Sequence, residues 1–296
     1  MNTKILLHGI AAVLLATCNT QLTTCFAQGA LTPPGAPAPS MKSLAQIEPR
    51  TPISLAPFTI NQPGSYYLTT NLSVTSGDGI TINANNVTVD LNGFTIASTA
   101  SPVNGYGIQL AVAGGNTDVT IYNGHITGGT TNNGSGVISG SGFSTGIDLP
   151  AIFTQNCRVK DVSVSGCLNY GIFLGTGDGS SVESCSVNST RYGIVADNVT
   201  HCSVRDGGNS GITATTASDC RAEISGGFGS FALSALTANN CAGICTGGGL
   251  GLSVPNGLAM GCYASSASGA AISAKIANSC VIGTGTVSIV NKYNMP

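Results

Sequence analysis

Charged residues are scarce in this chain of 296 residues. It holds 10 Lys and Arg and 12 Asp and Glu, which make up 7% of the sequence and leave a formal net charge of -2. The basic residues are scattered, so the sequence lacks the positive cluster that binding to a phosphate backbone requires. We therefore expect no nucleic-acid partner.

Aromatic residues and long apolar runs are also few. Only 5% of the residues are aromatic and none is Trp. After the first residues no apolar run is long enough to cross a bilayer, so we expect no transmembrane segment. The low charge does not mean disorder, because 42% of the residues are hydrophobic. The chain can therefore bury an extended core.

What is abundant is glycine, with 41 residues, and one phrase built on it recurs along the chain. In this phrase Gly and Ile are followed by a variable residue and then an apolar one. Six full copies are Gly79-Ile80-Thr81-Ile82, Gly107-Ile108-Gln109-Leu110, Gly146-Ile147-Asp148-Leu149, Gly171-Ile172-Phe173-Leu174, Gly193-Ile194-Val195-Ala196 and Gly211-Ile212-Thr213-Ala214. Two fainter copies start at Gly251 and Ala271. A unit that returns after 28, 39, 25, 22 and 18 residues indicates a repeat with loops of variable length.

The phrase predicts an all-β solenoid, a parallel β-helix. In a strand the Ile and the residue two positions later point the same way, so we expect them to point inward and the Gly and the intervening residue to point outward. Stacking such units buries a column that no single unit could bury. About nine coils at a rise of about 4.8 Å give an axis of roughly 43 Å. Taken alone, Asn92-Gly93 between two alternating runs would predict a hairpin, but the repeat argues against it.

The N-terminus has the pattern of a signal peptide, residues 1–27. Lys4 precedes an apolar run from Ile5 to Ala16, and a small residue, Ala27, ends the segment. A secreted, periplasmic or cell-surface protein is expected. The alternative is a lipoprotein anchored through Cys18, although the Thr before this Cys is a poor match to the lipoprotein pattern. Residues 28–50 are predicted to be a Pro-rich linker and a short cap, with a turn or two of helix at 41–48, followed by the β-helix at 51–296.

The segments Phe58-Thr-Ile-Asn-Gln-Pro-Gly-Ser-Tyr-Tyr-Leu68 and Gly79-Ile-Thr-Ile-Asn-Ala-Asn-Asn-Val-Thr-Val-Asp-Leu-Asn-Gly-Phe-Thr-Ile96 resemble the bacterial secreted right-handed parallel β-helix proteins of the pectate-lyase-like superfamily. The resemblance runs from about residue 51 to the end. Residues 33–53 resemble the lead segment of an uncharacterised secreted subgroup within them. The resemblance implies three sheets around one axis, an N-terminal cap and export. It implies no single activity, because this fold carries lyases, hydrolases, adhesive surfaces and members without known chemistry.

Fragments of a polygalacturonase-like site occur at Asn116-Thr117-Asp118, Gly124-His125 and Arg158-Val159-Lys160, but no Asp-Asp pair exists in the chain. The first two fragments are also too close in sequence to lie on neighbouring coils. Glycoside hydrolysis needs two carboxylates facing one bond, and a calcium-dependent lyase needs several converging oxygen ligands. The Asp residues are instead spread about one per coil, as turn formers would be. We therefore expect no catalytic residue, no metal and no cofactor.

Nine cysteines follow the signal region, and six of them are spaced by 17, 18, 21, 21 and 18 residues, close to the coil period. These six are Cys185, Cys202, Cys220, Cys241, Cys262 and Cys280, and we call them the cysteine ladder. Cysteines stacked on neighbouring coils could form disulfides, but an odd total leaves at least one thiol free. The favoured interpretation is that Cys serves here as a small buried apolar residue.

Aromatic residues stand directly before two successive Gly-Ile phrases. Tyr170 and Tyr192 should therefore stack on consecutive coils, with Arg191 beside them and Phe173 farther along the strand. Aromatic faces with polar neighbours suit sugar rings, so these residues and Asp148 are the candidate ligand-binding residues. A ladder that only shields a sheet edge is the alternative. The prediction is a non-catalytic surface or carbohydrate-binding protein whose partner is a polysaccharide or cell-envelope glycan. The alternatives are a carbohydrate-active enzyme with an unrecognised site and an oligomeric adhesive or structural module.

Overall fold

The computed structural model describes residues 47–111, 118–149, 155–176 and 179–295. The predicted signal peptide, Cys18 and most of the predicted linker and helix lie outside the described residues. The chain divides into the units Met1–Ile47 and Glu48–Pro296, and the second holds every strand described below.

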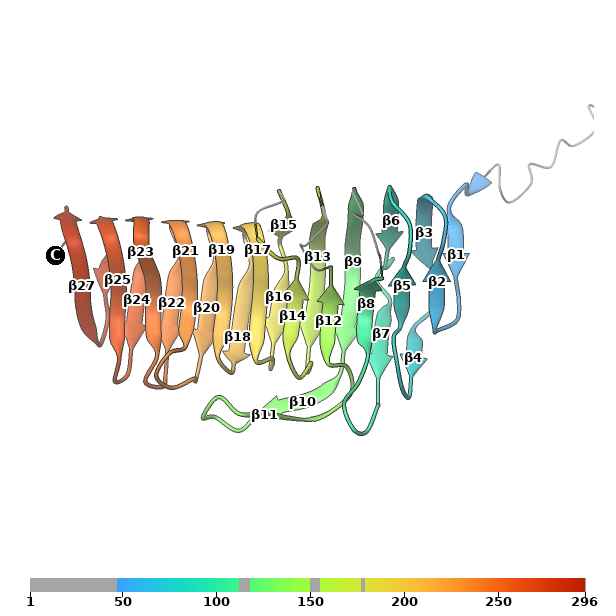
Figure 1. Ribbon diagram of the computed structural model, residues 1–296, viewed down its shortest axis with the longest axis horizontal. Helices are drawn as coiled ribbons and strands as arrows, with labels where there is room; N and C mark the ends of the chain where they lie inside the picture. The colour runs from blue at the N-terminus through green and yellow to red at the C-terminus, as the bar shows by residue number, and fades with distance from the viewer. Residues whose placement is uncertain (1–46, 112–117, 150–154, 177–178, 296) are drawn as a thin grey trace, which may run out of the picture. The chain divides into compact units, whose positions relative to one another are not determined.

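The unit Glu48–Pro296 is a parallel β-helix, as the repeat predicted (Figure 1). Each coil contributes to up to three parallel faces. The first face consists of β2 (Phe58–Ile60), β5 (Ile80–Ile82), β8 (Tyr106–Leu110), β12 (Thr145–Asp148), β14 (Tyr170–Phe173), β17 (Tyr192–Thr200), β19 (Ser210–Ser218), β21 (Phe231–Asn239), β23 (Leu250–Met260), β25 (Ala270–Asn278) and β27 (Thr286–Tyr293). The strands from β17 onward continue into the second face without a break.

The second face begins with β1 (Thr51–Ile53), β3 (Gly64–Leu68), β6 (Val87–Asp90), β9 (Val119–Thr127), β13 (Arg158–Ser165) and β15 (Ser181–Glu183). The third face contains the ends of β9 and β13 together with β4 (Leu72–Val74), β7 (Thr95–Ser98), β16 (Ser186–Asn188), β18 (Ser203–Gly207), β20 (Arg221–Ile224), β22 (Ala242–Cys245), β24 (Tyr263–Ser266) and β26 (Val281–Ile282). Asn92-Gly93 joins β6 of the second face to β7 of the third, and both strands pair in parallel with β9, so it forms a corner and no hairpin.

The apolar residues of the phrase stack in register through the core. Ile147 pairs with Ile108 and Ile172, and the column continues through Ile194 and Ile212, all of them fully buried. In the described part of the chain eleven strands stack in the first face, where the repeat had indicated about nine coils. The rungs without a recognised phrase are β2, β21 and β27. The inward direction predicted for the Ile is confirmed.

The prediction that the Gly of each phrase points outward is wrong. Gly107 is buried, and a Cβ atom there would lie 2.6 Å from the carbonyl oxygen of Gly146 and 2.6 Å from Cγ2 of Ile126 on the third face. The Gly of the phrase therefore packs against the third face, and no larger residue fits there because side chains of that face fill the space. On β21 the Gly of the phrase is replaced by Ala232, and the third-face residue of that coil is Gly243. The preceding coil has the reverse arrangement, with Gly211 on the first face and Ala222 on the third. Small residues thus exchange across the core.

A single residue in the left-handed region makes the corner between the second and third faces. Examples are Asp161 with φ 52°, His201 with φ 53° and Asp219 with φ 54°. The cysteine ladder follows directly after these corners, and every one of its thiols is buried and free. The burial expected of Cys serving as a small apolar residue is confirmed.

One antiparallel hairpin leaves the stack, formed by β10 (Gly129–Asn132) and β11 (Ile138–Ser141). Figure 1 shows it outside the faces, extending along the stack toward the C-terminal strands. Thr130 donates from its backbone N–H to Gly166 O, and Asn132 Nδ2 donates to Ser225 Oγ at 2.9 Å. The hairpin is therefore anchored to several successive coils.

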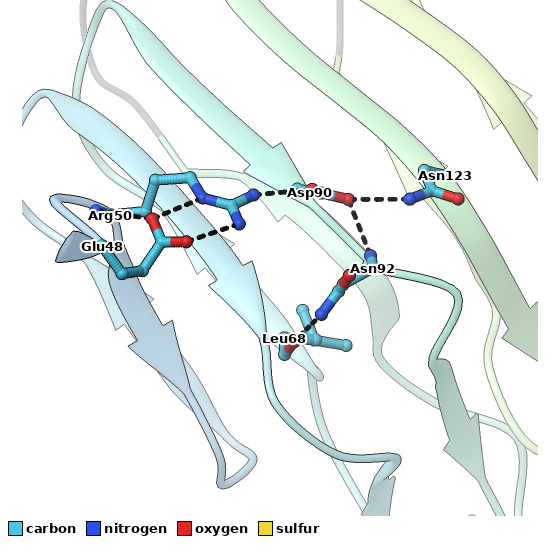
Figure 2. Close-up of polar contacts among 6 residues, drawn as sticks. All are labelled: Glu48, Arg50, Leu68, Asp90, Asn92 and Asn123. Carbon is cyan, nitrogen blue, oxygen red and sulfur yellow. Dashed lines mark hydrogen bonds and ion pairs between the residues drawn. The ribbon is translucent and has the colours of Figure 1, made fainter.

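At the N-terminal end a polar network joins residues 48–50 to the second face (Figure 2). Arg50 donates to both carboxylate oxygens of Glu48 and, at 2.7 Å, to Asp90 Oδ2, while its guanidinium lies 4.6 Å from the centre of the Tyr67 ring. Hydrogen bonding to Arg50 lowers the pKa of Glu48. Asp90 also accepts from the side-chain amide of Asn123 at 3.1 Å. The network fastens the segment before β1 to the first coils.

Candidate functional site

The predicted stacking of Tyr170 and Tyr192 is confirmed. The two residues pair in register on β14 and β17, their ring centres are 4.8 Å apart and the ring planes differ by 23°. Phe173 packs against Tyr170 with ring centres 4.7 Å apart, at a tilt of 46°. The three rings form one aromatic cluster on the outer side of the first face.

The neighbours of this cluster in the column differ in how well they are covered. Going back from Tyr170, the next residue in register is Thr145, which is buried and 3% exposed, and beyond it lies Tyr106. Going forward from Tyr192, the next residue is Ser210, which is only partly buried, and beyond it lies Phe231. A small partly covered residue therefore separates two aromatic residues that stand two coils, or about 9.6 Å, apart along the axis. We call this position the Ser210 gap.

Asp148 lies on the same face, in register between Gln109 and Phe173. Burial, and secondarily the charge of Asp78, raises the pKa of Asp148 to about 6. Burial also raises the pKa of Tyr170, with contributions from Tyr192 and Asp148. The structure thus brings four of the five candidate residues together. The turn role expected for the Asp residues does not hold for Asp148, because its side chain faces outward from a strand.

Arg191, the fifth candidate, lines a groove beside the cluster. This groove has a volume of about 270 Å³ and lies between the tip of the β10–β11 hairpin and the corner where the third face meets the first. Its coil side is formed by Arg191, Tyr192, Asn209 and Ser230. Asn209 donates to the Tyr192 hydroxyl at 3.3 Å and accepts from Ser230 Oγ at 2.5 Å. A chain of polar groups therefore runs from the Tyr192 ring into the groove.

Two exposed apolar residues near this groove were missed in the sequence. Val137, at the hairpin tip, lines the groove and is 57% exposed. Phe228 is fully exposed in the loop between β20 and β21, whose residues Gly226 and Gly227 line the groove. An aromatic residue within a glycine-rich loop was the available signal for Phe228. Nothing in the sequence indicated that the hairpin reaches this corner.

The fragments that suggested a polygalacturonase-like site do not converge. Asp118 occupies a left-handed turn with φ 61°, and Asn116 lies outside the described residues. His125 lies on the third face, whereas Arg158 and Lys160 lie on the second. Lys160 instead contacts Glu183, with 3.7 Å between Nζ and Oε2.

Comparison with known proteins assigns no family to the chain. It matches no protein-family model. No curated protein matches it either. Among the described residues, no helix has the length and apolar character to cross a membrane, and no three His, Cys, Asp or Glu side chains converge to hold a metal ion. On its own geometry the chain is a parallel β-helix protein whose outer features gather around Tyr192.

Proposed function

We propose that this protein is an exported, non-catalytic carbohydrate-binding member of the right-handed parallel β-helix proteins of the pectate-lyase-like superfamily. Its binding site is the aromatic cluster together with the hairpin groove. The partner is a polysaccharide or cell-envelope glycan.

The observation that carries the proposal is the position of the Tyr192 ring between a large aromatic residue on one side and a small residue on the other. Tyr170 covers one face of this ring, and Ser210, on the other side, is too small to cover the second. The CH groups of a sugar ring pack well on such a face, while its hydroxyl groups need donors and acceptors at the edge. The Ser210 gap supplies the face, and Arg191, Asn209 and Ser230 supply polar groups in the adjoining groove.

The size of the Ser210 gap also fits one ring. Two aromatic residues about 9.6 Å apart along the axis leave room for a single ring at about 4.8 Å from each, which is also the distance between the stacked rings of Tyr170 and Tyr192. Thr145 also lies in register between two aromatic residues, Tyr106 and Tyr170, but it is buried and leaves no space for a ligand between them. Only the forward gap is therefore offered to a ligand in this column from Tyr106 to Phe231.

The alternative of a carbohydrate-active enzyme rests on one observation. Asp148, with its pKa raised to about 6, shares a face with Asp78 and the Tyr170 ring. A carboxyl group with a raised pKa is what a general acid needs. Binding is favoured, because the Tyr106 backbone N–H donates to Asp78 at 3.0 Å and the residues that line the groove include no carboxylate.

The test is a glycan-array screen of the purified protein, followed by titration of the best ligand. Tyr192→Ala should weaken binding at least tenfold, about 1.4 kcal/mol. Ser210→Tyr should do the same by closing the gap without removing any aromatic residue. Tyr263→Ala is the matched control, because that exposed Tyr lies on β24 of the third face, and it should bind as the parent does.

Turnover assays on uronate polymers and neutral glycans accompany the array. Turnover that Asp148→Asn abolishes would establish the enzyme in place of the binding protein. Glycan binding that is unchanged in both Tyr192→Ala and Ser210→Tyr would refute the site. Self-association with no glycan bound would favour the adhesive module.

A further inference from the structure

The cysteine ladder lies at a different corner of the coils from the proposed glycan site. Tyr192 begins β17, whereas Cys202 follows the end of that strand. Its six thiols lie at equivalent positions on consecutive coils, each directly after the corner between the second and third faces. A packing role alone would be met by Val, since Val162 is buried at the equivalent position on an earlier coil. Packing alone therefore does not explain why these six positions are cysteine.

The sulfur atoms share one orientation. Cys202 Sγ lies 3.1 Å from the Thr200 carbonyl oxygen, Cys220 Sγ lies 3.1 Å from that of Ser218, and Cys241 Sγ repeats the contact with Asn239. Since equivalent atoms of neighbouring coils are separated by the strand spacing, successive sulfurs rise by about 4.8 Å per coil. The ladder is thus a straight row of sulfurs at nearly constant intervals.

Backbone donors point at these sulfurs. The Cys185 N–H donates to Cys202 Sγ at 3.4 Å. The backbone of Cys202 hydrogen-bonds to the Cys220 sulfur in the same way, and that of Cys220 to the Cys241 sulfur. Such donors stabilise a negatively charged sulfur.

A shallow groove of about 430 Å³ leads to the middle of the ladder. Cys202, Cys220 and Cys241 contribute to its lining, together with the corner residues His201, Asp219 and Asn240. Asp219 Oδ2 lies 3.8 Å from His201 Nε2, and its Oδ1 accepts from Asn240 Nδ2 at 2.6 Å. The entrance to the thiols is therefore polar, and both the carboxylate of Asp219 and the guanidinium of Arg221 belong to its lining.

We propose that the ladder binds copper(I), each ion held in linear two-coordination between the thiolates of adjacent coils. Two copper–sulfur bonds span a little over 4 Å, so sulfurs about 4.8 Å apart need to approach each other only slightly to hold one ion. Soft thiolate ligands select copper(I), whereas zinc in structural sites requires four ligands in a tetrahedron. A straight row of sulfurs offers two ligands to an ion and no more.

The reaction is a ligand exchange without a change of oxidation state. For each ion two S–H bonds break, two sulfur–metal bonds form and two protons pass to solvent, leaving one net negative charge per pair. The backbone N–H donors stabilise that charge. Six thiols form three pairs, so the ladder holds three ions at saturation. The pair Cys220 and Cys241 fills first, because both line the groove.

The probe is silver(I), an air-stable ion with the same linear preference, added to the full chain carrying Cys18→Ser and Cys25→Ser. Native mass spectrometry should find three bound ions, and a pH-stat should record two protons released per ion. Zinc(II) at the same concentrations should not bind. X-ray absorption of the copper(I)-loaded protein should show two sulfur ligands per metal and no third ligand.

Two ladder variants and one control locate the ions. Cys220→Val leaves five ladder thiols and should bind two ions, and Cys262→Val should do the same, so a folding defect in one leaves the other informative. Cys167→Val is the control, because this buried Cys lies outside the ladder and its removal should leave three ions. Circular dichroism verifies that each protein keeps its strand signal during titration. Three ions in both ladder variants, loss of an ion in the control, zinc binding, or silver binding only as strand signal disappears would each overturn the proposal.

Discussion

The exchange of small residues across the core predicts the effect of adding one methyl group. In Gly211→Ala the new Cβ would collide with the carbonyl oxygen of Ala232 and lie 2.8 Å from the Cβ of Ala222. Overpacking a rigid core costs about 1 to 3 kcal/mol, and because one colliding atom belongs to the backbone we expect the upper half, about 2 to 3 kcal/mol. In a unit of this size that lowers the melting temperature by about 5 °C or more.

The double variant Gly211→Ala/Ala222→Gly tests the exchange itself, because it recreates the arrangement of Ala232 and Gly243 one coil later. We expect it to cost no more than Gly211→Ala alone, a favourable coupling of about 1 to 2 kcal/mol. The assay is urea unfolding followed by circular dichroism, comparing midpoints at equal slopes. Gly227→Ala, whose Cβ would meet no atom within 4 Å, is the control and should change stability by less than about 0.5 kcal/mol. Simple addition of the two single costs in the double variant would refute the exchange.

Three further predictions concern Asp148 and the cysteine ladder. Because the pKa of Asp148 is raised to about 6 in the folded state, above its unfolded value, the folded protein binds this proton more tightly. The free energy of unfolding should therefore fall as the pH rises from about 4 to about 6, and urea titrations of Asp148→Asn should lack that slope; a slope that persists belongs to another group. Cys202→Ser should cost about 1 kcal/mol and Cys202→Ala about 2 kcal/mol, because a hydroxyl can use the Thr200 carbonyl that the thiol uses. Alkylation after unfolding without reductant should find the thiols free, whereas a set of disulfides would show that the ladder is a covalent staple.

The core of this fold could be predicted because it depends on a local pattern repeated many times. Each Gly-Ile phrase carries the same inward Ile, so its register with the next coil follows from the sequence. The direction of the Gly could not be predicted, because alternation along one strand does not reveal that the third face packs against the Gly. The coil of Ala232 was missed for the same reason. This coil has Ala on the first face and its Gly at position 243 on the third face, and only the fold shows that these two positions face each other.

The candidate site was half predictable. Tyr170 and Tyr192 occupy the same place in successive phrases, so their stacking follows from register. The environment of Asp148 does not, because its raised pKa arises from burial and from Asp78 two coils earlier. The groove does not either. The long interval between the phrases at Gly107 and Gly146 indicated an insertion, but no local rule says where a hairpin of that insertion comes to lie.

That hairpin shows how a solenoid acquires a site without disturbing its core. The faces must keep a constant rise, so a change of length is tolerated only at a corner, where residues leave the ladder of backbone hydrogen bonds. The insertion between β9 and β12 leaves such a corner and is held against later coils by Asn132, which donates to Asp206 O and to Ser225 Oγ. It therefore forms one wall of a groove whose other wall belongs to coils well beyond its own. Residues that look like loop variation in one repeat thus decide what the aromatic column of another repeat can bind.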